Sequence, residues 1–583
     1  MFIRDQIQEL VRGAAMVAFS QADLSEINVE YPAELTHGDY STNVALILAK
    51  QVSLKPREVA EKIVEELKKG GTKILSKIEI AGPGFINFFL SPEYLIGECQ
   101  GILVHSSSFG NSDYKNGKTI VTDTSHPNVA KPMGVHHLLS TIIGNSINRI
   151  LAAVGYKVIR DNYLGDWGTQ FGKLIWAYKN WGDEVVVKSD PIPELQKLYV
   201  RFHNEVETRP ELDDLGRAEF KKLEAGGGEN RKLWKWIVDL SIEQFTEIWS
   251  RLGVSFDYIH GESFYEDKMQ EIIDMGIQKG LFVEGEKKAG TTGAGALIFK
   301  FEHEKYPPCI IRKSDGATIY ATRDLARTKY WQDTWHPDLM VIVADTAQEL
   351  HFKQFFEVAH ALGITNAPNI HAWFGRMSFP EKRMSTRKGN IILMEELLDE
   401  AEEMAGEVVN EKNPNLGEAQ RKEVARVVGI GAVKYAVLAQ NRQTNVIFTW
   451  DKMLSLDGNS APYLQYVFAR AWSILRKSGV TDLEQLIDEK MNPLLVEQTE
   501  VTLSRLVIRL PEIISFAADE LKPNLLTNYL FQVASQFNSF YSAVNVMKTE
   551  GALKQARLAL VGSTIVVLKN GLALLGIEAP MEM

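Results

Sequence analysis

The fold is decided by a polar loop that reads Ser125-His126-Pro127-Asn128-Val129-Ala130-Lys131-Pro132-Met133-Gly134-Val135-His136-His137. The apolar run 118–122 before it predicts a buried strand, and apolar residues at helical spacing over 138–154 predict a helix after it. A second apolar run at 157–160 predicts another strand. The pattern is a βαβ unit, whose ligand site lies at the helix N-terminus. Free N–H groups there favour phosphate, and His and Lys side chains add donors.

Length and composition indicate a large globular protein. At 583 residues the chain has room for roughly four domains of about 150 residues each. No window approaches the ~18 apolar residues of a membrane span, and the start lacks a signal-peptide pattern. Two distant cysteines, Cys99 and Cys309, indicate neither a zinc site nor a disulfide framework. We therefore expect a cytoplasmic protein with no membrane contact and no protein metal site. The net charge of −11 argues only weakly against a nucleic-acid partner.

The elements change character along the chain, which predicts a multidomain α/β protein. Residues 1–115 mix helices with a strand pair and predict a small α+β domain. Residues 116–410 alternate strands and helices, with a charged helical insertion at about 181–250. From 411 to 583 the strand signal disappears, which predicts an all-α bundle.

A second basic loop, Arg383-Met384-Ser385-Thr386-Arg387-Lys388-Gly389-Asn390, suits a mobile segment that closes on phosphates. The loop at 125–137 resembles the first signature of class I aminoacyl-tRNA synthetases, in the form used by arginyl-tRNA synthetases, and the second basic loop resembles their second signature. This chain departs from the first signature: Gly134 stands where its first His is usual, and His136 where its Gly is usual. In the second signature, Thr386 replaces a Lys, and the resemblance implies that Lys131 offsets this loss.

The resemblance runs along the whole chain and implies a Rossmann-type catalytic domain between two tRNA-binding domains. His37-Gly38-Asp39-Tyr40 and 82–88 resemble the family's N-terminal domain, which grips the tRNA elbow. The runs 457–466 and 575–583 resemble its C-terminal anticodon-binding domain. The implied partners are L-arginine and tRNA(Arg), the implied cofactors are ATP and Mg²⁺ bound with ATP, and we expect a monomer.

Site residues follow from the resemblance and from chemistry. Guanidinium is a planar fork of five donors, which carboxylates match best. For arginine binding we predict Asp123 (where a Glu is usual), Asn128, Glu262, Tyr320, Asp324 and Gln348. For catalysis we predict Lys131, His136, His137, Arg387 and Lys388. For ATP binding we predict Pro132, Gly134, His136, His137, Met384 and Ser385. For tRNA binding we predict Phe85, Asn87, Tyr463 and Met583.

Purely structural roles and other protein classes are alternatives to these assignments. Taken singly, Asp324 and Arg323 could form a surface ion pair, Glu262 could cap a helix, and the two histidines could be a solvated cap. The glycine-rich run 165–172 favours a role in shaping the site floor. A cysteinyl enzyme is disfavoured, because the chain lacks zinc ligands. A non-catalytic tRNA-binding paralogue, suggested by Gly134 and His136, is disfavoured because Lys131 and the pocket carboxylates are retained.

Overall fold

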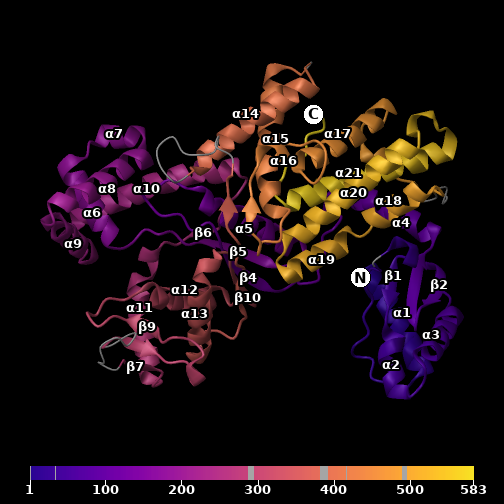
Figure 1. The fold of residues 1–583 in the computed structure, drawn as a ribbon, viewed down its shortest axis with the longest axis horizontal. Helices are drawn as coiled ribbons and strands as arrows, with labels where there is room; N and C mark the ends of the chain where they lie inside the picture. Colours follow the sequence, from indigo (N-terminus) through magenta and orange to yellow (C-terminus); the bar gives the residue numbers. More distant parts are fainter. Residues whose placement is uncertain are drawn as a thin grey trace.

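A computed structural model describes residues 2–32, 34–285, 295–380, 392–414, 416–488, 491 and 495–583. The predicted site residues Met384, Ser385, Arg387 and Lys388 lie outside the described residues. Figure 1 shows an elongated molecule with the N-terminal unit beneath the C-terminal bundle at one end. A group of helices, α6–α10, forms the other end, and the five-stranded sheet lies between them.

The N-terminal unit packs helices on a small antiparallel sheet of order β1-β3-β2. Each helix buries one apolar stripe against this sheet or its neighbours, as Ile7, Val11 and Ala15 do on α1. The next helix, α4, instead packs against α18 and α21 of the C-terminal bundle. The bounds are α1 Ile3–Ala18, β1 Tyr40–Thr42, α2 Val44–Val52, α3 Pro56–Gly70, β2 Leu75–Ala81, β3 Phe85–Leu90 and α4 Pro92–His105.

The central sheet is parallel throughout and has the order β11-β10-β4-β5-β6. From β4 the chain adds β5 and β6 on one side, and it then adds β10 and β11 on the other side of β4. The order of the strands therefore reverses between β4 and β10. Ligands bind beyond the carboxyl ends of the strands at such a switch point. The predicted Rossmann-type body is thereby confirmed. The bounds are β4 Thr119–Asp123, α5 Val135–Ala153, β5 Lys157–Asn162, β6 Tyr258–Ile259, α12 Tyr320–Trp335, β10 Leu339–Ile342, α13 Glu349–Ala361 and β11 Asn369–His371.

Two insertions interrupt this sheet. Between β5 and β6 lie five helices, and the first, α6, packs on α8 and α9, so that the helical unit starts at Thr169 rather than near 181. Between β6 and α12 lies an antiparallel sheet of order β7-β8-β9, which the sequence analysis missed. The bounds are α6 Thr169–Trp181, α7 Glu184–Ser189, α8 Pro191–Thr208, α9 Glu211–Glu224, α10 Gly228–Arg251, α11 Met269–Gln278, β7 Phe282–Glu284, β8 Leu297–Phe299 and β9 Cys309–Arg312.

The C-terminal region is a helical bundle, as predicted, and one short strand, β13, pairs with β12. The only described helix that is long and apolar enough to cross a membrane is α21, but 72% of its apolar window is buried, which makes it the core helix of the bundle. The bounds are β12 Met377–Ser378, α14 Met394–Lys412, α15 Glu418–Leu438, β13 Val446–Ile447, α16 Trp450–Met453, α17 Ala461–Lys477, α18 Gln498–Val507, α19 Leu510–Glu520, α20 Pro523–Ala543 and α21 Gly551–Leu574.

Part of the motif 37–40 joins the two terminal regions. The buried Asp39 carboxylate lies 2.9 Å from Arg505 Nε on α18. The hydroxyl of buried Tyr40 donates to Glu512 on α19 at 3.1 Å. Because buried charges are stabilised only by such partners, these two residues hold the N-terminal unit on the bundle.

Candidate active site

The loop after β4 is strained and firmly held. Ser125, His126 and Ala130 all have positive φ, between 48° and 84°, which is costly for residues other than glycine. The Ser125 amide donates to Ser140 Oγ at 2.9 Å, and that hydroxyl donates to the Val343 carbonyl at 2.6 Å. These bonds bring the loop, α5 and the end of β10 together at the switch point of the sheet.

Two histidines stand at the entrance of α5. The Gly134 amide donates to Nδ1 of buried His137 at 3.2 Å, so the remaining proton of that neutral ring lies on Nε2. Burial, with the neighbouring His136 and His126, lowers the pKa of His137 to about 3. The exposed His136 ring lies 3.9 Å from the His137 ring, centre to centre. His137 therefore caps the start of α5 through Nδ1, as the alternative interpretation predicted. Its Nε2–H is left as a neutral donor.

The segment that follows the second basic loop, from Ile392 on, lies against this entrance. The Val135 amide donates to the Ile392 carbonyl at 3.1 Å, and the Met394 amide donates to the Met133 carbonyl at 2.8 Å. On the other side of the loop, Lys131 Nζ lies 5.4 Å from the centre of the Tyr199 ring on α8. The first signature loop and the segment just after the second basic loop thus meet where α5 begins.

A cavity of about 470 Å³ opens beyond the carboxyl ends of β4 and β10. It brings together all six residues that were predicted to bind arginine: Asp123, Asn128, Glu262, Tyr320, Asp324 and Gln348. They come from segments between positions 123 and 348, so only the fold brings them together. Tyr320 is 60% exposed, and its ring lies 4.7 Å from that of His351.

Gly165, the first residue of the glycine-rich run 165–172, lines this cavity. A Cβ on Gly165 would lie 2.4 Å from Asn128 Oδ1, so glycine lets the Asn128 amide lie directly over the chain. The Asp166 carboxylate accepts from the Ser263 amide at 2.9 Å and from its hydroxyl at 2.6 Å. Asp166 therefore holds the short helix Glu262–Lys268, whose first residue is a predicted arginine ligand.

The Glu262 carboxylate has only a weak ion pair to offset the cost of its burial. Its Oε2 lies 3.4 Å from Arg323 Nη1, a long contact, whereas Arg323 pairs with Glu266 at 2.6 Å. Burial raises the pKa of Glu262 to about 7, against the opposing effect of Arg323. A carboxylate that is only partly ionised near neutral pH gains charge when a cation arrives.

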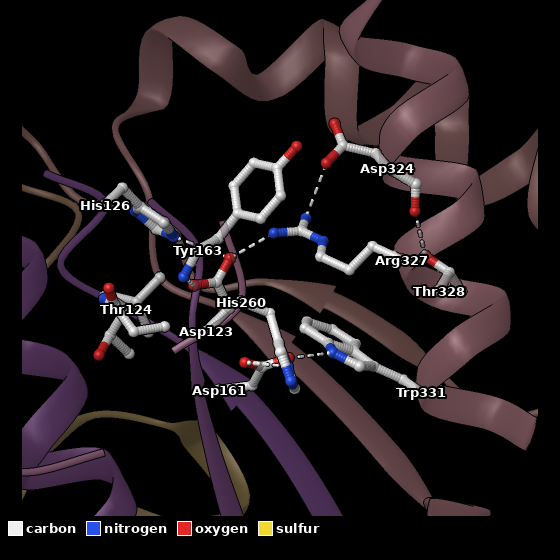
Figure 2. A network of polar contacts seen from close by, with 12 residues as sticks. Asp123, Thr124, His126, Asp161, Tyr163, His260, Asp324, Arg327, Thr328 and Trp331 are labelled. Carbon is white, nitrogen blue, oxygen red and sulfur yellow. Dashed lines mark hydrogen bonds and ion pairs between the residues drawn. The ribbon is translucent and has the colours of Figure 1, made fainter. Parts of the chain in front are cut away.

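Asp324 does not form the surface ion pair with Arg323 that was one alternative. It is 6% exposed and lies 3.0 Å from Arg327 Nη2 and 2.6 Å from His351 Nε2. Burial raises the pKa of Asp324, but Arg327 and His351 outweigh it and hold that pKa below the ordinary value. Figure 2 shows the Arg327 guanidinium between Asp324 and Asp123.

Asp123 is fully buried, and both its oxygens have protein partners. Oδ2 lies 2.5 Å from Arg327 Nη1 and 2.9 Å from His126 Nε2, and Oδ1 accepts from the Tyr163 amide at 3.2 Å. Its role as a direct arginine ligand stays a prediction. The sequence analysis assigned no part in the pocket to His126 or Arg327. Arg327 had a signal, because it follows Tyr320 and Asp324 at helical spacing.

The predicted tRNA residues lie far from this cavity. On β3, Phe85 is 40% exposed, and Asn87 is buried and accepts from Ser41 Oγ at 2.8 Å. Both line a second cavity of about 630 Å³ in the N-terminal unit. On α17, the Tyr463 hydroxyl accepts from Asn538 at 2.9 Å, which ties it into the bundle, and Met583 is half-buried.

The bundle also has a surface set that the sequence analysis did not assign as a site. The Arg470 guanidinium lies 4.7 Å from the Tyr466 ring and 5.4 Å from the Tyr541 ring. Tyr541 is exposed. Aromatic and guanidinium planes of this kind are suited to stacking on unpaired bases.

Residues 98–450 match the family model of the class I tRNA synthetase (R) catalytic domain, and residues 464–583 match the DALR anticodon-binding domain. With the Rossmann-type sheet and the first signature loop at its switch point, this match defines a class I aminoacyl-tRNA synthetase. Residues 1–90 match the arginyl-tRNA synthetase N-terminal domain. The chain belongs to the arginyl-tRNA synthetase family. The exact domain limits, 115 and 410 among them, stay predictions.

Curated relatives agree over the full length. The arginine–tRNA ligase of Fusobacterium nucleatum subsp. nucleatum is 42% identical over 560 residues, 96% of both chains. That of Exiguobacterium sibiricum is 41% identical over 585 residues, 100% of both chains. Among solved structures, the arginyl-tRNA synthetase of Plasmodium falciparum has a TM-score of 0.81 at 23% identity and covers 100% of this chain and 99% of its own. The Thermus thermophilus enzyme has a TM-score of 0.81 at 22% identity, with full coverage of both chains. These two show the shared fold.

Proposed function

We propose that the cavity beyond β4 and β10 binds L-arginine, and that the entrance of α5 binds ATP. The protein is an arginine–tRNA ligase, which converts L-arginine, ATP and tRNA(Arg) to arginyl-tRNA, AMP and pyrophosphate. The observation that carries the site assignment is the meeting of six predicted guanidinium and amino-end ligands in one cavity beside the signature loop. The assay that tests the function is charging of a tRNA pool with each amino acid in turn; arginine alone is expected to be attached.

Activation requires a carboxylate oxygen of arginine to attack the α-phosphorus of ATP, while the bond to pyrophosphate breaks. The protein's task is to orient two anions and neutralise charge as pyrophosphate leaves. His137 would donate from Nε2 without carrying charge, and the free amides of α5 add the positive end of the helix. Lys131, with Arg387 and Lys388, would supply the cations. A ribose hydroxyl of tRNA then attacks the arginyl carbonyl and releases AMP.

The residues present fit Mg²⁺ only as a companion of ATP. Within the described ranges no group of three His, Cys, Asp or Glu side chains could hold a metal ion. The triphosphate itself would therefore supply most ligands, as is usual for this ion. Monomeric state, absence of membrane contact and a cytoplasmic location complete the proposal; two buried free cysteines, Cys99 and Cys309, suit a reducing compartment.

Arginine binding is expected to strengthen as pH rises from about 6 to about 8. The ionised form of Glu262 binds a guanidinium, and with its pKa at about 7 that form is scarce below neutrality. The groups that face Glu262 are Arg323, Asp166, Asp324 and Glu266. The KM for arginine should be up to about tenfold higher at the acidic end. Glu262→Gln should show a flatter profile, and an unchanged slope in that variant would assign the pH dependence to another group.

The aromatic side chain on β3 is expected to matter for tRNA alone. Phe85→Ala should raise the KM for tRNA(Arg), because stacking of one base on an aromatic ring is worth about 1–3 kcal/mol. The KM for arginine should not change, since Phe85 lies in the N-terminal unit. Val17→Ala, at an exposed apolar position of α1 that does not line this cavity, is the matched control. Equal tRNA affinity in Phe85→Ala and wild type would remove Phe85 from the tRNA contact.

A further inference from the structure

The proposed arginine pocket already contains a guanidinium that belongs to the protein. Arg327 on α12 is 2% exposed and lines the cavity. One terminal nitrogen lies 2.5 Å from Asp123 Oδ2 and the other lies 3.0 Å from Asp324 Oδ1 (Figure 2). Asp123 at the end of β4 and Asp324 on α12 are thus joined through the donors of one guanidinium.

Arg327 is held on its faces as well as at its edge. Its Cζ lies 4.4 Å from the centre of the Tyr163 ring and 5.0 Å from that of Trp331. Trp331 is itself fixed, because its indole N–H donates to Asp161 at 2.7 Å. An incoming guanidinium could displace Arg327 only by breaking two buried ion pairs and leaving the side chain without a partner. Arg327 is therefore a permanent part of the wall.

The charge arrangement explains what this wall does. Asp123 and Asp324 are both buried, and besides Arg327 their side chains contact His126 and His351, respectively. Two like charges in one buried site oppose each other's ionisation. With Arg327 in place, the pKa of Asp324 stays below its ordinary value, and one oxygen of each carboxylate is oriented by a terminal nitrogen of Arg327. A carboxylate offers about four acceptor positions, so Asp324 keeps capacity for a substrate donor after its two protein contacts.

We propose that Arg327 is a positioning residue for arginine recognition, a resident guanidinium that holds Asp324 in the orientation in which it receives the guanidinium of the substrate. The inference rests on the proposed arginine pocket. It assigns three tasks to three groups. Arg327 orients Asp324 and is not displaced, and Asp324 accepts hydrogen bonds from the substrate guanidinium. Because the positive charge of Arg327 offsets the negative charge of Asp324, Glu262 supplies the negative charge that attracts the substrate.

The test is steady-state charging by full-length Arg327→Met, which keeps an unbranched apolar stem and removes the charge and the donors of the guanidinium. The KM for arginine is expected to rise by about tenfold to 100-fold, because a misplaced binding group costs this much. The KM for ATP is expected to stay within about twofold, since Arg327 does not reach the entrance of α5. Lys329→Met is the matched control, a loss of charge on the same helix outside the cavity, where Lys329 pairs with Asp333 and Glu271.

Chemical rescue separates positioning from simple packing. In Arg327→Ala, added methylguanidinium is expected to enter the vacated space and lower the KM for arginine again, whereas methylammonium should not. If the Met and Ala variants do not fold, Arg327→Lys decides: its single ammonium cannot bridge two carboxylates, so the KM for arginine should still rise.

A lower or unchanged KM for arginine in a folded Arg327 variant would overturn the inference, and competition by methylguanidinium instead of rescue would mean that Arg327 occupies the substrate's own site. Glu262→Gln distinguishes the underlying assignment. If that variant also keeps the wild-type KM for arginine, the pocket itself is wrongly assigned. If Glu262→Gln weakens arginine while Arg327→Met does not, only the role of Arg327 fails.

Discussion

Asp324→Asn is expected to lower kcat/KM for arginine by about 10²- to 10³-fold, because truncating one partner of a buried, hydrogen-bonded charge pair costs about 2–5 kcal/mol. The amide keeps the shape of the side chain but has no charge for the substrate, for Arg327 or for His351. Arg327 would retain only Asp123 as a buried anionic partner. The loss should therefore appear both in arginine affinity and in a lower melting temperature.

The experiment compares charging kinetics and thermal unfolding of Asp324→Asn with those of Asp333→Asn. Asp333 lies on the same helix, pairs with Lys329 and has a largely exposed side chain, so its replacement should change neither quantity appreciably. A folded Asp324→Asn enzyme with the wild-type KM for arginine would show that this carboxylate serves the wall of the pocket and not the substrate.

His137→Ala is expected to slow adenylate formation by about 10²- to 10³-fold, the usual loss when one preorganised donor to a developing charge is removed. The ring is neutral at all working pH values, because its pKa lies at about 3, and its Nδ1 already accepts from the Gly134 amide. Only Nε2–H is left to act on a phosphate. Pyrophosphate exchange in the presence of tRNA(Arg) measures this step.

His137→Asp separates the donor from the helix cap. Aspartate can accept the Gly134 amide bond and suits a helix N-terminus, so it should recover the stability of about 0.5–2 kcal/mol that the cap contributes. It has no donor and repels phosphate, so exchange should stay slow. Wild-type exchange in His137→Asp would mean that capping is the whole role. His136→Ala tests the neighbouring ring in the same assay, and a loss of about 2–4 kcal/mol is expected if that imidazole replaces the donor missing at position 134.

The sequence by itself determined the order of elements and the chemistry of the site. Strand and helix periods are local, so the βαβ unit around 125–137, the parallel body and the helical C-terminal region could be predicted from spacing alone. The short strands β7, β8 and β9 were missed, because three or four residues are too few to show the alternation of apolar and polar residues that marks a strand. The six residues predicted to bind arginine could be named because each stands in a recognisable motif, and all six line one cavity.

Only the tertiary structure decided which charges meet. Arg327 and Asp123 lie 204 positions apart, and nothing local in either segment indicates their contact. In the same way, Asp39 and Tyr40 were predicted within a tRNA-binding motif and turned out to hold the bundle, through Arg505 and Glu512. A backbone pattern is set by neighbours along the chain. The partner of a buried charge is set by whichever element the fold packs against it, because a charge without water must find its counter-charge in three dimensions.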